Sequence, residues 1–404
     1  MNVYGEDVEI DVDITDQGEG VSCFGKMPDG VGVFVDGKCV PGDKVRARIT
    51  QVNPNMLRAN LVDIITPAAE RITPSCPHFN QCGGCKWQQI PYDRELEIKF
   101  KRVKDALERI GHSTGFELRP VIGSPATEGY RNKLTFTCDD DGTIGYHLPG
   151  DAQAILPINN CLLGDETMNA ILHRCRETGF RKLVIRKSEH AGKYQALINN
   201  LPTKIDGLPV TIKKHLEERL LNFTYRISPE AFFQVNTRQA ERMVRESLAL
   251  AKPQPNEKIL ELYCGLGTFS LPFASRCRKL VGFEASKQAV KDAETNARLN
   301  HLSNCNFHAV NLNKAEALTF RRKLGFTPEL ILTDPPRAGM PGHLCDILLD
   351  IGAKRILYIS CNPATLARDI ERLSNKYVLD VIQPIDLFPR TEHVECVALL
   401  RQKD

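Results

Sequence analysis

The sequence contains no apolar run that approaches the roughly 18 residues a membrane span needs. Its first twenty residues, MNVYGEDVEIDVDITDQGEG, are acidic and lack the basic region and apolar core of a secretory signal. There is also no internal repeat and no low-complexity tract. We therefore expect a globular protein that does not associate with membranes. Its fourteen cysteines, without a signal, indicate a reducing, cytoplasmic compartment.

Positive charge is scarce at the start of the chain, where no Lys or Arg precedes Lys26. The formal net charge is only +3, so total charge does not identify a nucleic-acid-binding protein. The basic runs KFKRVK, RKLVIRK and RRK supply local positive fields at 99–104, 181–187 and 321–323. Such runs suit phosphate contacts, but they are also common on solvated faces.

A chain of 404 residues is too long for one ordinary core. Short alternating stretches separated by Gly and Pro turns predict a small β-barrel over 1–66. Prolines then mark a linker, and residues 67–229 form a mixed α+β central domain that includes an amphipathic helix over 92–111, which we expect to pack on the last domain. The last domain, 230–404, alternates apolar runs with helical segments, as parallel sheets do.

The last two apolar runs, YVLDVI and VECVALL, are joined by a loop too short for a crossover helix. The final strand should therefore run antiparallel to the others. Six parallel strands and one antiparallel strand predict an α/β fold of the Rossmann-like, seven-stranded methyltransferase type.

A glycine turn in LELYCGLGTFS opens the nucleotide end of this sheet at Gly265 and Gly267. Glu284 ends the next strand, where a carboxylate can accept both ribose hydroxyls. The third glycine of a dinucleotide fingerprint is absent, because Ser270 occupies that position. S-adenosylmethionine is therefore a better cofactor candidate than a dinucleotide.

Three reactive side chains should meet at the carboxyl edge of the sheet. Asp334 and Cys361 end parallel strands, and Glu395 begins the antiparallel last strand. A thiolate that adds to carbon 6 of uracil makes carbon 5 nucleophilic, and this chemistry needs one Cys, one base and the cofactor. Cys396 should point to the other face of its strand, into the core.

Three thiols cluster in CPHFNQCGGCKW, at Cys76, Cys82 and Cys85. A closed metal site needs a fourth ligand. Cys161 is the best candidate, because Cys138 and Cys175 lie in strand-like and helical contexts. Four thiolates suit either zinc or an iron–sulfur cluster.

The motifs SPEAFFQVN, LELYCGLGTFSL, LTDPPRAG, SCNPATLARD and HVECVALL together resemble the RNA 5-methyluridine methyltransferases. The resemblance implies that Cys361 is the nucleophile, that Glu395 removes the carbon-5 proton, and that Asp334 helps hold uracil and cofactor. It also implies an S-adenosylmethionine pocket lined by Gln234, Tyr263, Gly265, Thr268, Glu284 and Asn311.

The CGGCKW and NCLLGD segments are similar to the iron–sulfur branch of that family, which implies a 4Fe–4S cluster on Cys76, Cys82, Cys85 and Cys161. The N-terminal stretch GEGVSCFGKMPDGVGVFVDGKCVPGDKVRARI resembles a TRAM domain, an OB-like RNA-binding barrel. GYRNKLTF resembles an RNA-contacting segment, which implies contacts from Arg131 and Lys133.

By analogy with that branch, we expect a monomer that methylates carbon 5 of a specific uridine in 23S-type ribosomal RNA. Transfer RNA is the second candidate substrate. Two competing hypotheses are an amino-methyltransferase that uses Asp334-Pro335-Pro336 on a purine, and a non-enzymatic iron–sulfur protein that binds RNA.

Overall fold

The computed structural model describes residues 4–18, 20–176, 180–314 and 317–403. The outermost ends of the predicted first and last domains, 1–3 and 404, lie outside these ranges. Among the described residues, no helix is long and apolar enough to cross a membrane. Contacts within the chain divide it into two compact units. The first comprises Met1–Lys99, His147–Leu156 and Phe388–Glu392, and the second comprises Phe100–Tyr146, Pro157–Leu387 and His393–Asp404.

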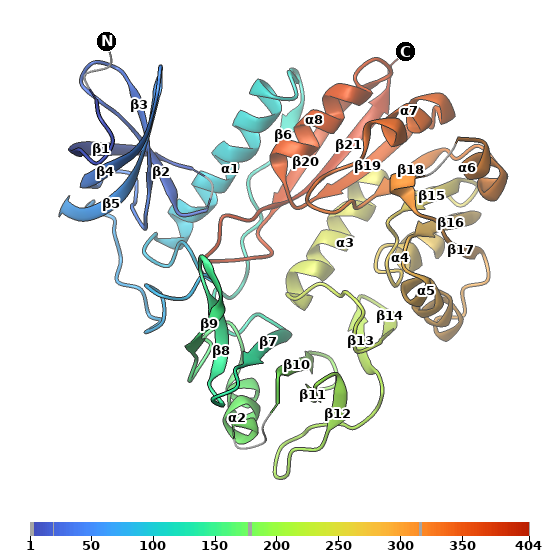
Figure 1. Cartoon of the computed structure of the whole chain (residues 1–404). Helices are drawn as coiled ribbons and strands as arrows, with labels where there is room; N and C mark the ends of the chain where they lie inside the picture. Colours follow the sequence, from blue (N-terminus) through green and yellow to red (C-terminus); the bar gives the residue numbers. More distant parts are fainter. Residues whose placement is uncertain (1–3, 19, 177–179, 315–316, 404) are drawn as a thin grey trace. The chain divides into compact units, whose positions relative to one another are not determined.

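The predicted N-terminal barrel is confirmed as a closed barrel of five strands in the order β1-β2-β3-β5-β4 (blue in Figure 1). Alternate side chains of β1 and β4 are buried, as period-two patterning requires, and they meet in one apolar core. A parallel pairing of β3 with β5 contributes to closing the barrel. The strands are β1 Glu9–Gln17, β2 Ser22–Lys26, β3 Gly32–Asp36, β4 Lys44–Asn53 and β5 Met56–Thr66.

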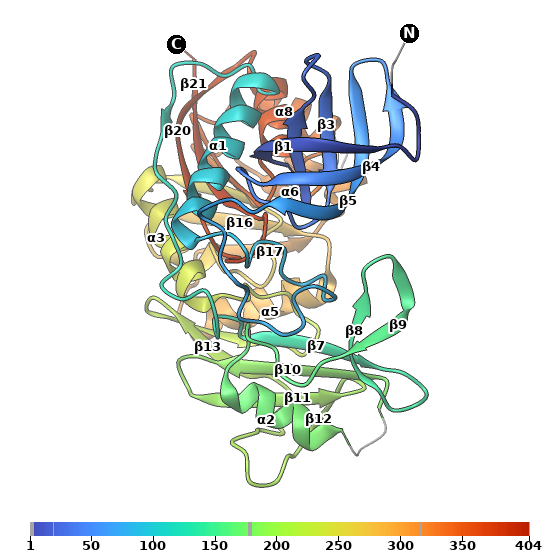
Figure 2. The same cartoon turned by 90° about the vertical axis from the view of Figure 1, so that its left-hand side faces the viewer.

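The middle of the chain forms a six-stranded sheet in the order β12-β11-β10-β7-β8-β9 (green in Figure 2) and a separate hairpin, β13–β14. The bounds are β7 Lys133–Cys138, β8 Ile144–Leu148, β9 Asp151–Pro157, α2 Glu166–Cys175, β10 Lys182–Ser188, β11 Lys193–Ile198, β12 Leu201–Thr203, β13 Leu216–Leu220 and β14 Phe223–Ile227.

The last third forms the α/β sheet, with strand order β17-β16-β15-β18-β19-β21-β20-β6. The strands β15 to β19 pair in parallel, and β21 is antiparallel to both β19 and β20. Its strands are β15 Lys258–Leu262, β16 Lys279–Glu284, β17 Cys305–Ala309, β18 Leu330–Thr333, β19 Arg355–Ser360, β20 Tyr377–Ile385 and β21 Glu395–Gln402. The helices are α3 Thr237–Ala251, α4 Ser270–Ala274, α5 Lys287–Leu299, η1 Leu312–Lys314, α6 Ala317–Leu324, α7 Gly342–Ile351 and α8 Pro363–Leu373.

The expected seven-stranded sheet has an eighth strand, β6 (Glu117–Leu118), which pairs in parallel with β20. Two residues carry no readable periodicity, so the sequence could not indicate this strand. The helix predicted over 92–111 is α1, Tyr92–Arg109. Its residues Val103, Ala106 and Leu107 belong to the same buried cluster as the strands of the α/β sheet.

Candidate active site

The carboxyl edge of the sheet brings together the three predicted reactive residues. Asp334 directly follows β18, Cys361 directly follows β19, and Glu395 is the first residue of β21. Ser360 pairs with Cys396 in the antiparallel register of β19 and β21, so the next position along each strand places Cys361 opposite Glu395. Figure 1 shows these strands side by side.

Burial and the repulsion between neighbouring negative charges raise the pKa values of the ionisable groups at this edge. Burial, with a smaller contribution from the charge of Asp334, raises the pKa of Glu395 to about 8, and burial raises the pKa of Asp334 to about 7. Burial, followed by the charges of Glu395 and Asp334, raises the pKa of the Cys361 thiol to about 12, which Arg337 partly opposes. At neutral pH the thiol is therefore protonated, and it has two carboxyl groups in its immediate surroundings.

The chain turns sharply at Cys361 because a helix begins there. Asn362 caps α8 by accepting a hydrogen bond from the Ala364 amide at 3.1 Å, and Pro363 occupies the first helical position, where its missing N–H is harmless. The Asn362 amide group and the Thr365 hydroxyl both donate to the Arg337 carbonyl, at 3.3 and 3.1 Å. The loop after Asp334 is thus tied to the turn that carries the thiol.

A buried carboxylate on α8 fixes the same loop, and sequence reasoning missed it. Asp369 accepts hydrogen bonds from the Met340 amide and from the Tyr358 hydroxyl, both at 2.7 Å. Gly339 has φ +75°, and an added Cβ there would lie 2.5 Å from the Asp369 carboxylate. The position therefore needs glycine both for its backbone conformation and for this close approach.

The predicted nucleotide end of the sheet has the expected turn. Gly265 and Gly267 have φ of +53° and +95°. Glu284, the last residue of β16, accepts hydrogen bonds from the Gly265 amide at 3.1 Å and from the Ser286 amide at 2.8 Å. The carboxylate is thereby held at the glycine turn, where it could receive ribose hydroxyls.

Tyr263, just before this turn, is the strained residue of the site, with φ +60°. Its hydroxyl is buried and has no hydrogen-bond partner among the residues the structure describes. A buried, unpaired hydroxyl is costly, so a bound molecule that supplied a partner here would be favoured. This observation fits a nucleoside cofactor at the turn.

The remaining predicted pocket residues come from different elements. Gln234 is buried in the segment before α3, and its carbonyl accepts from the Asn132 side chain at 2.9 Å. Thr268 is half-buried and its carbonyl accepts from the Tyr225 hydroxyl at 3.0 Å. Asn311 is exposed beyond the end of β17, the strand next to that of Glu284.

Glu261, inside the apolar run of β15, is a second functional candidate that sequence reasoning missed. It is buried and accepts a hydrogen bond from the Ser270 hydroxyl. Burial raises its pKa to about 8 against the lowering effect of that bond, and the charges of Asp334 and Glu284 add to the rise. Its carboxyl group is therefore close enough to both Asp334 and Glu284 for their charges to act on it. In the sequence, the one indication of this site was an acidic residue within the apolar run KILELY.

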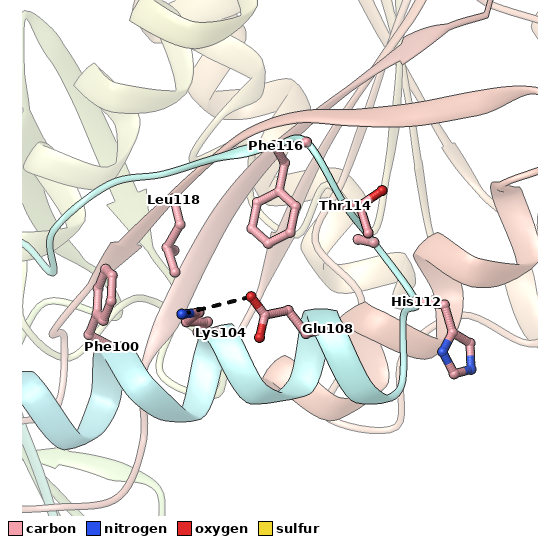
Figure 3. A pocket seen from close by; sticks show the side chains of 9 residues that line it. Phe100, Lys104, Glu108, His112, Thr114, Phe116 and Leu118 are labelled. Carbon is pink, nitrogen blue, oxygen red and sulfur yellow. Dashed lines mark ion pairs between the residues drawn. The ribbon is translucent and has the colours of Figure 1, made fainter.

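Cys396 is fully buried within the apolar cluster of the sheet, so its predicted core role is confirmed. A separate cavity of about 610 Å³ lies between α1 and the 112–118 segment, as Figure 3 shows. Phe100, Phe116 and Leu118 line it together with the Lys104–Glu108 ion pair. It contains none of the predicted site residues.

The thiol segment belongs to the first unit. Cys76, Cys82 and Cys85 are all half-buried, and the Gly84 amide donates to the Cys82 sulfur at 3.4 Å. Burial lowers the pKa of Lys38, whereas the charges of the three thiols raise it, so this ammonium lies near all three. Cys161 belongs to the second unit. In the described ranges, no three His, Cys, Asp or Glu side chains are gathered as a metal site.

The residues just before Glu395 are held by the segment that follows the thiols. The amides of Lys86 and Trp87 both donate to the Arg390 carbonyl, at 2.9 and 3.1 Å. The Lys86 ammonium pairs with Glu392 at 2.7 Å. Arg390 and Glu392, two charged residues shortly before Glu395, therefore both have partners within the first unit.

The two predicted RNA contacts lie at the start of β7. The Arg131 amide donates to the Leu163 carbonyl at 2.8 Å. Lys133 stands opposite Arg186 in the sheet. Burial, and then the charges of Arg186 and Lys182, lower the pKa of Lys133 to about 8. Lys133 is therefore part of a cationic cluster.

Comparisons with known proteins agree with this geometry. Residues 202–403 match the family described as tRNA (Uracil-5-)-methyltransferase, and residues 8–62 match the TRAM domain. An uncharacterised RNA methyltransferase of Chlorobaculum tepidum is 33% identical over 466 aligned positions, which cover 98% of this chain and 96% of that protein. Another, from Bacteroides thetaiotaomicron, is 31% identical and covers 89% and 95%.

A solved structure also resembles nearly the whole chain. It is a Pyrococcus abyssi tRNA (uracil-54, C5)-methyltransferase in complex with S-adenosyl-L-homocysteine, with a TM-score of 0.75 at 26% identity. The match covers 97% of this chain and 100% of that one.

Fold and glycine turn together are those of an S-adenosylmethionine-dependent methyltransferase with an N-terminal TRAM barrel. The chain belongs to the tRNA (Uracil-5-)-methyltransferase family and is an RNA methyltransferase. The hypothesis of a non-enzymatic protein is therefore wrong, and a purine amino group as the methyl acceptor has no support from the family.

Proposed function

We propose that this enzyme methylates carbon 5 of a uridine in RNA through a covalent bond between Cys361 and carbon 6 of the base. The observation that carries the proposal is the meeting of Cys361, Glu395 and Asp334 at adjacent strand ends. One thiol and two carboxyl groups at a single edge are the parts that this chemistry requires.

In the proposed sequence, a carboxylate accepts the Cys361 proton and the sulfur adds to carbon 6, which moves an electron pair toward carbon 5. S-adenosylmethionine would supply the methyl group to carbon 5, and its sulfur would keep the electron pair of the broken bond and leave as S-adenosylhomocysteine. Glu395 then removes the carbon-5 proton, the bond between sulfur and carbon 6 breaks, and Cys361 leaves with the electron pair. A pKa of Glu395 near 8 suits a base that works close to neutral pH. The uridine must be flipped out of its stack to reach the thiol.

We further propose that Glu284 and the turn at Gly265 hold the ribose of the cofactor and that the buried Tyr263 hydroxyl finds its partner there. Gln234, Thr268 and Asn311 complete the pocket, and Asp334 borders both cofactor and base. Arg131 and Lys133 contact RNA, a role that suits the cationic surroundings of Lys133.

Ribosomal RNA of the 23S type is our proposed substrate, and transfer RNA is the second candidate. A tRNA methyltransferase from Pyrococcus abyssi is similar over 97% of this chain. The presence of a barrel and a central domain therefore does not separate the two substrates, and this observation strengthens the case for transfer RNA.

A 4Fe–4S cluster on Cys76, Cys82, Cys85 and Cys161 is also proposed. Four thiolates are a donor set that such a cluster uses, and the proposal is supported by the half-buried thiols and by the amide hydrogen bond that the Cys82 sulfur accepts. We propose that the cluster stabilises the fold. The division into 1–66, 67–229 and 230–404, the monomeric state and the cytoplasmic location likewise stay predictions.

The decisive experiment is nucleoside mass spectrometry of ribosomal and transfer RNA from cells with and without the gene. We expect 5-methyluridine to disappear from one position of one RNA class and to return when the purified enzyme is added. If every 5-methyluridine persists in the deleted strain and purified enzyme methylates neither RNA, the proposed activity is wrong.

A further inference from the structure

A small cavity of about 220 Å³ opens between the β13–β14 hairpin and the first turns of α5. Its volume is below that of sites for drug-sized ligands, so it suits a small chemical group. The lining residues are Lys214, His215, Arg226, Ser228, Gln288, Lys291, Asp292 and Thr295. Their side chains are all polar or charged, and three of them are cations.

None of these three cations forms an ion pair in the part of the chain that the structure describes. Lys214, Arg226 and Lys291 have no carboxylate within 4.0 Å there. The arginines on the outside of the barrel differ, since Arg46 pairs with Asp11 at 3.2 Å and Arg48 pairs with Glu9 at 2.9 Å. A cation that already forms an ion pair attracts an added anion less strongly. The three cations of the cavity form no ion pair with a described residue that would weaken this attraction.

The cavity wall is held in place by its own hydrogen bonds. The Arg226 guanidinium donates to Nδ1 of His215 at 2.8 Å. Asn296 of α5 accepts from the Arg226 amide at 2.8 Å and also donates to the Leu266 carbonyl, so that the hairpin is joined to the helix. Arg226 is therefore oriented before any ligand arrives.

Two carboxylates lie near the cations: Asp292 in the lining, and Glu217, which stands opposite Arg226 in the hairpin and 3.8 Å from Nε2 of His215. Asp292 is buried, and its Oδ1 accepts from the Ser228 hydroxyl at 2.8 Å and from the Gln288 amide at 3.0 Å. Asp292 and Glu217 together offset two of the three cations, so the cavity and its rim keep a small net positive charge. The amino-terminal turns of α5 add the positive end of a helix dipole.

The elements around the cavity continue directly into the proposed cofactor site. The helix α5 begins three residues after Glu284, and the chain that leaves β14 runs through Ser228 to Gln234. An RNA strand that presents its uridine at the end of β19 would have to extend past β18 and β15 to bring a phosphate to this cavity.

We propose that this cavity binds a backbone phosphate of the RNA substrate, at a nucleotide other than the one that is methylated. The proposal builds on the proposed function, because it assumes that RNA is bound at this edge. Lys291, Arg226 and Lys214 make the contact, and the contact is independent of base sequence.

The test compares Lys291→Gln, Arg226→Gln and the double variant with Arg245→Gln, an exposed arginine of α3 that pairs with Glu241 at 2.8 Å. Affinity for a substrate transcript is measured by filter binding across a salt series. We expect a several-fold loss for each single variant and a salt slope lower by about one in the double variant. Arg245→Gln should match the wild type.

Further arms separate a phosphate contact from a change in folding or in cofactor binding. Lys291→Arg should keep the affinity and Lys291→Glu should lower it more than Lys291→Gln. Thermal unfolding and calorimetric binding of S-adenosylmethionine should not change. Unchanged RNA affinity and salt slope in the double variant would overturn the proposal, as would an equal loss in Arg245→Gln. Binding of orthophosphate without any effect on RNA affinity would also overturn it.

The proposed activity is judged separately, from 5-methyluridine formed by the wild type. If the wild type methylates RNA and the double variant binds RNA normally, only the phosphate site is wrong. If the wild type forms no 5-methyluridine, the proposed function is wrong whatever the salt slopes are.

Discussion

Cys361 and the three thiols of the 76–85 segment are held by different kinds of backbone. Cys361 follows a buried strand, precedes a capped helix and stands opposite Glu395 through strand register. Cys76, Cys82 and Cys85 lie in a segment without strands or helices, and their predicted fourth partner belongs to another unit. Strand register places the proposed catalytic thiol before any ligand binds, whereas the proposed loop site would be completed only by the cluster that it is proposed to hold.

Replacing the strand-end thiol should have the largest effect. Cys361→Ala removes the proposed nucleophile, so 5-methyluridine formation should fall on the order of 10³-fold or more. Calorimetry should still detect S-adenosylmethionine binding, because Cys361 is not part of the proposed cofactor pocket. Cys305→Ser, at a half-buried thiol of β17, is the control and should retain activity. Substantial methylation by Cys361→Ala, measured by mass spectrometry, would disprove the covalent route.

Glu395→Gln should allow the covalent adduct to form but prevent the later removal of the carbon-5 proton. Without the base, turnover should fall by roughly 10²- to 10⁴-fold. The adduct between Cys361 and carbon 6 should then accumulate as a protein–RNA band that survives denaturing electrophoresis. The same band should be absent from the double variant with Cys361→Ala. Absence of the band from Glu395→Gln itself would count against Glu395 as the base.

The pH profile should report the same carboxyl group. Burial raises the pKa of Glu395 to about 8, so the group is protonated, and inactive as a base, well below that pH. We expect kcat/KM to rise about tenfold per pH unit up to about pH 8 and then to level off. Arg337 lowers the pKa of both Glu395 and Cys361, so Arg337→Gln should move the rise to higher pH. An unchanged profile in that variant would remove Arg337 from the site.

Removal of the proposed cluster from Cys76, Cys82 and Cys85 should lower the stability of the protein. If the proposed cluster is present, the purified protein absorbs visible light, and Cys82→Ser or iron chelation of the intact protein should remove that absorbance and lower Tm by several degrees. Cys305→Ser again serves as the control. If iron is lost while Tm stays constant, the proposed stabilising role of the cluster fails.

The smallest effect is expected at the Lys86–Glu392 pair. The Glu392 side chain is 5% exposed, so Lys86→Met leaves a buried carboxylate without this cation and should destabilise the protein by about 1–3 kcal/mol. Denaturant unfolding measures the loss. Adding Glu392→Gln to Lys86→Met should recover part of it. A double-mutant cycle with no coupling would show that the pair contributes nothing.

The same contrast explains what the sequence could predict. Asp334, Cys361 and Glu395 were predictable because alternation, strand ends and one short loop determine which edge each residue occupies. Glu261 and Asp369 were not, because a single acidic letter in a buried element does not show which donors surround it. The strand β6 and the lining of the β13–β14 cavity depend on packing between distant segments.

The position of β21 has a consequence for the order of folding. It lies between β19 and β20, both of which precede it in the chain. During synthesis these two strands emerge first, and they join one sheet only when the last strand enters between them and pairs with both. That strand carries Glu395 at its beginning. The sheet and the proposed base therefore become complete in one late step, so a nascent chain should not acquire activity gradually.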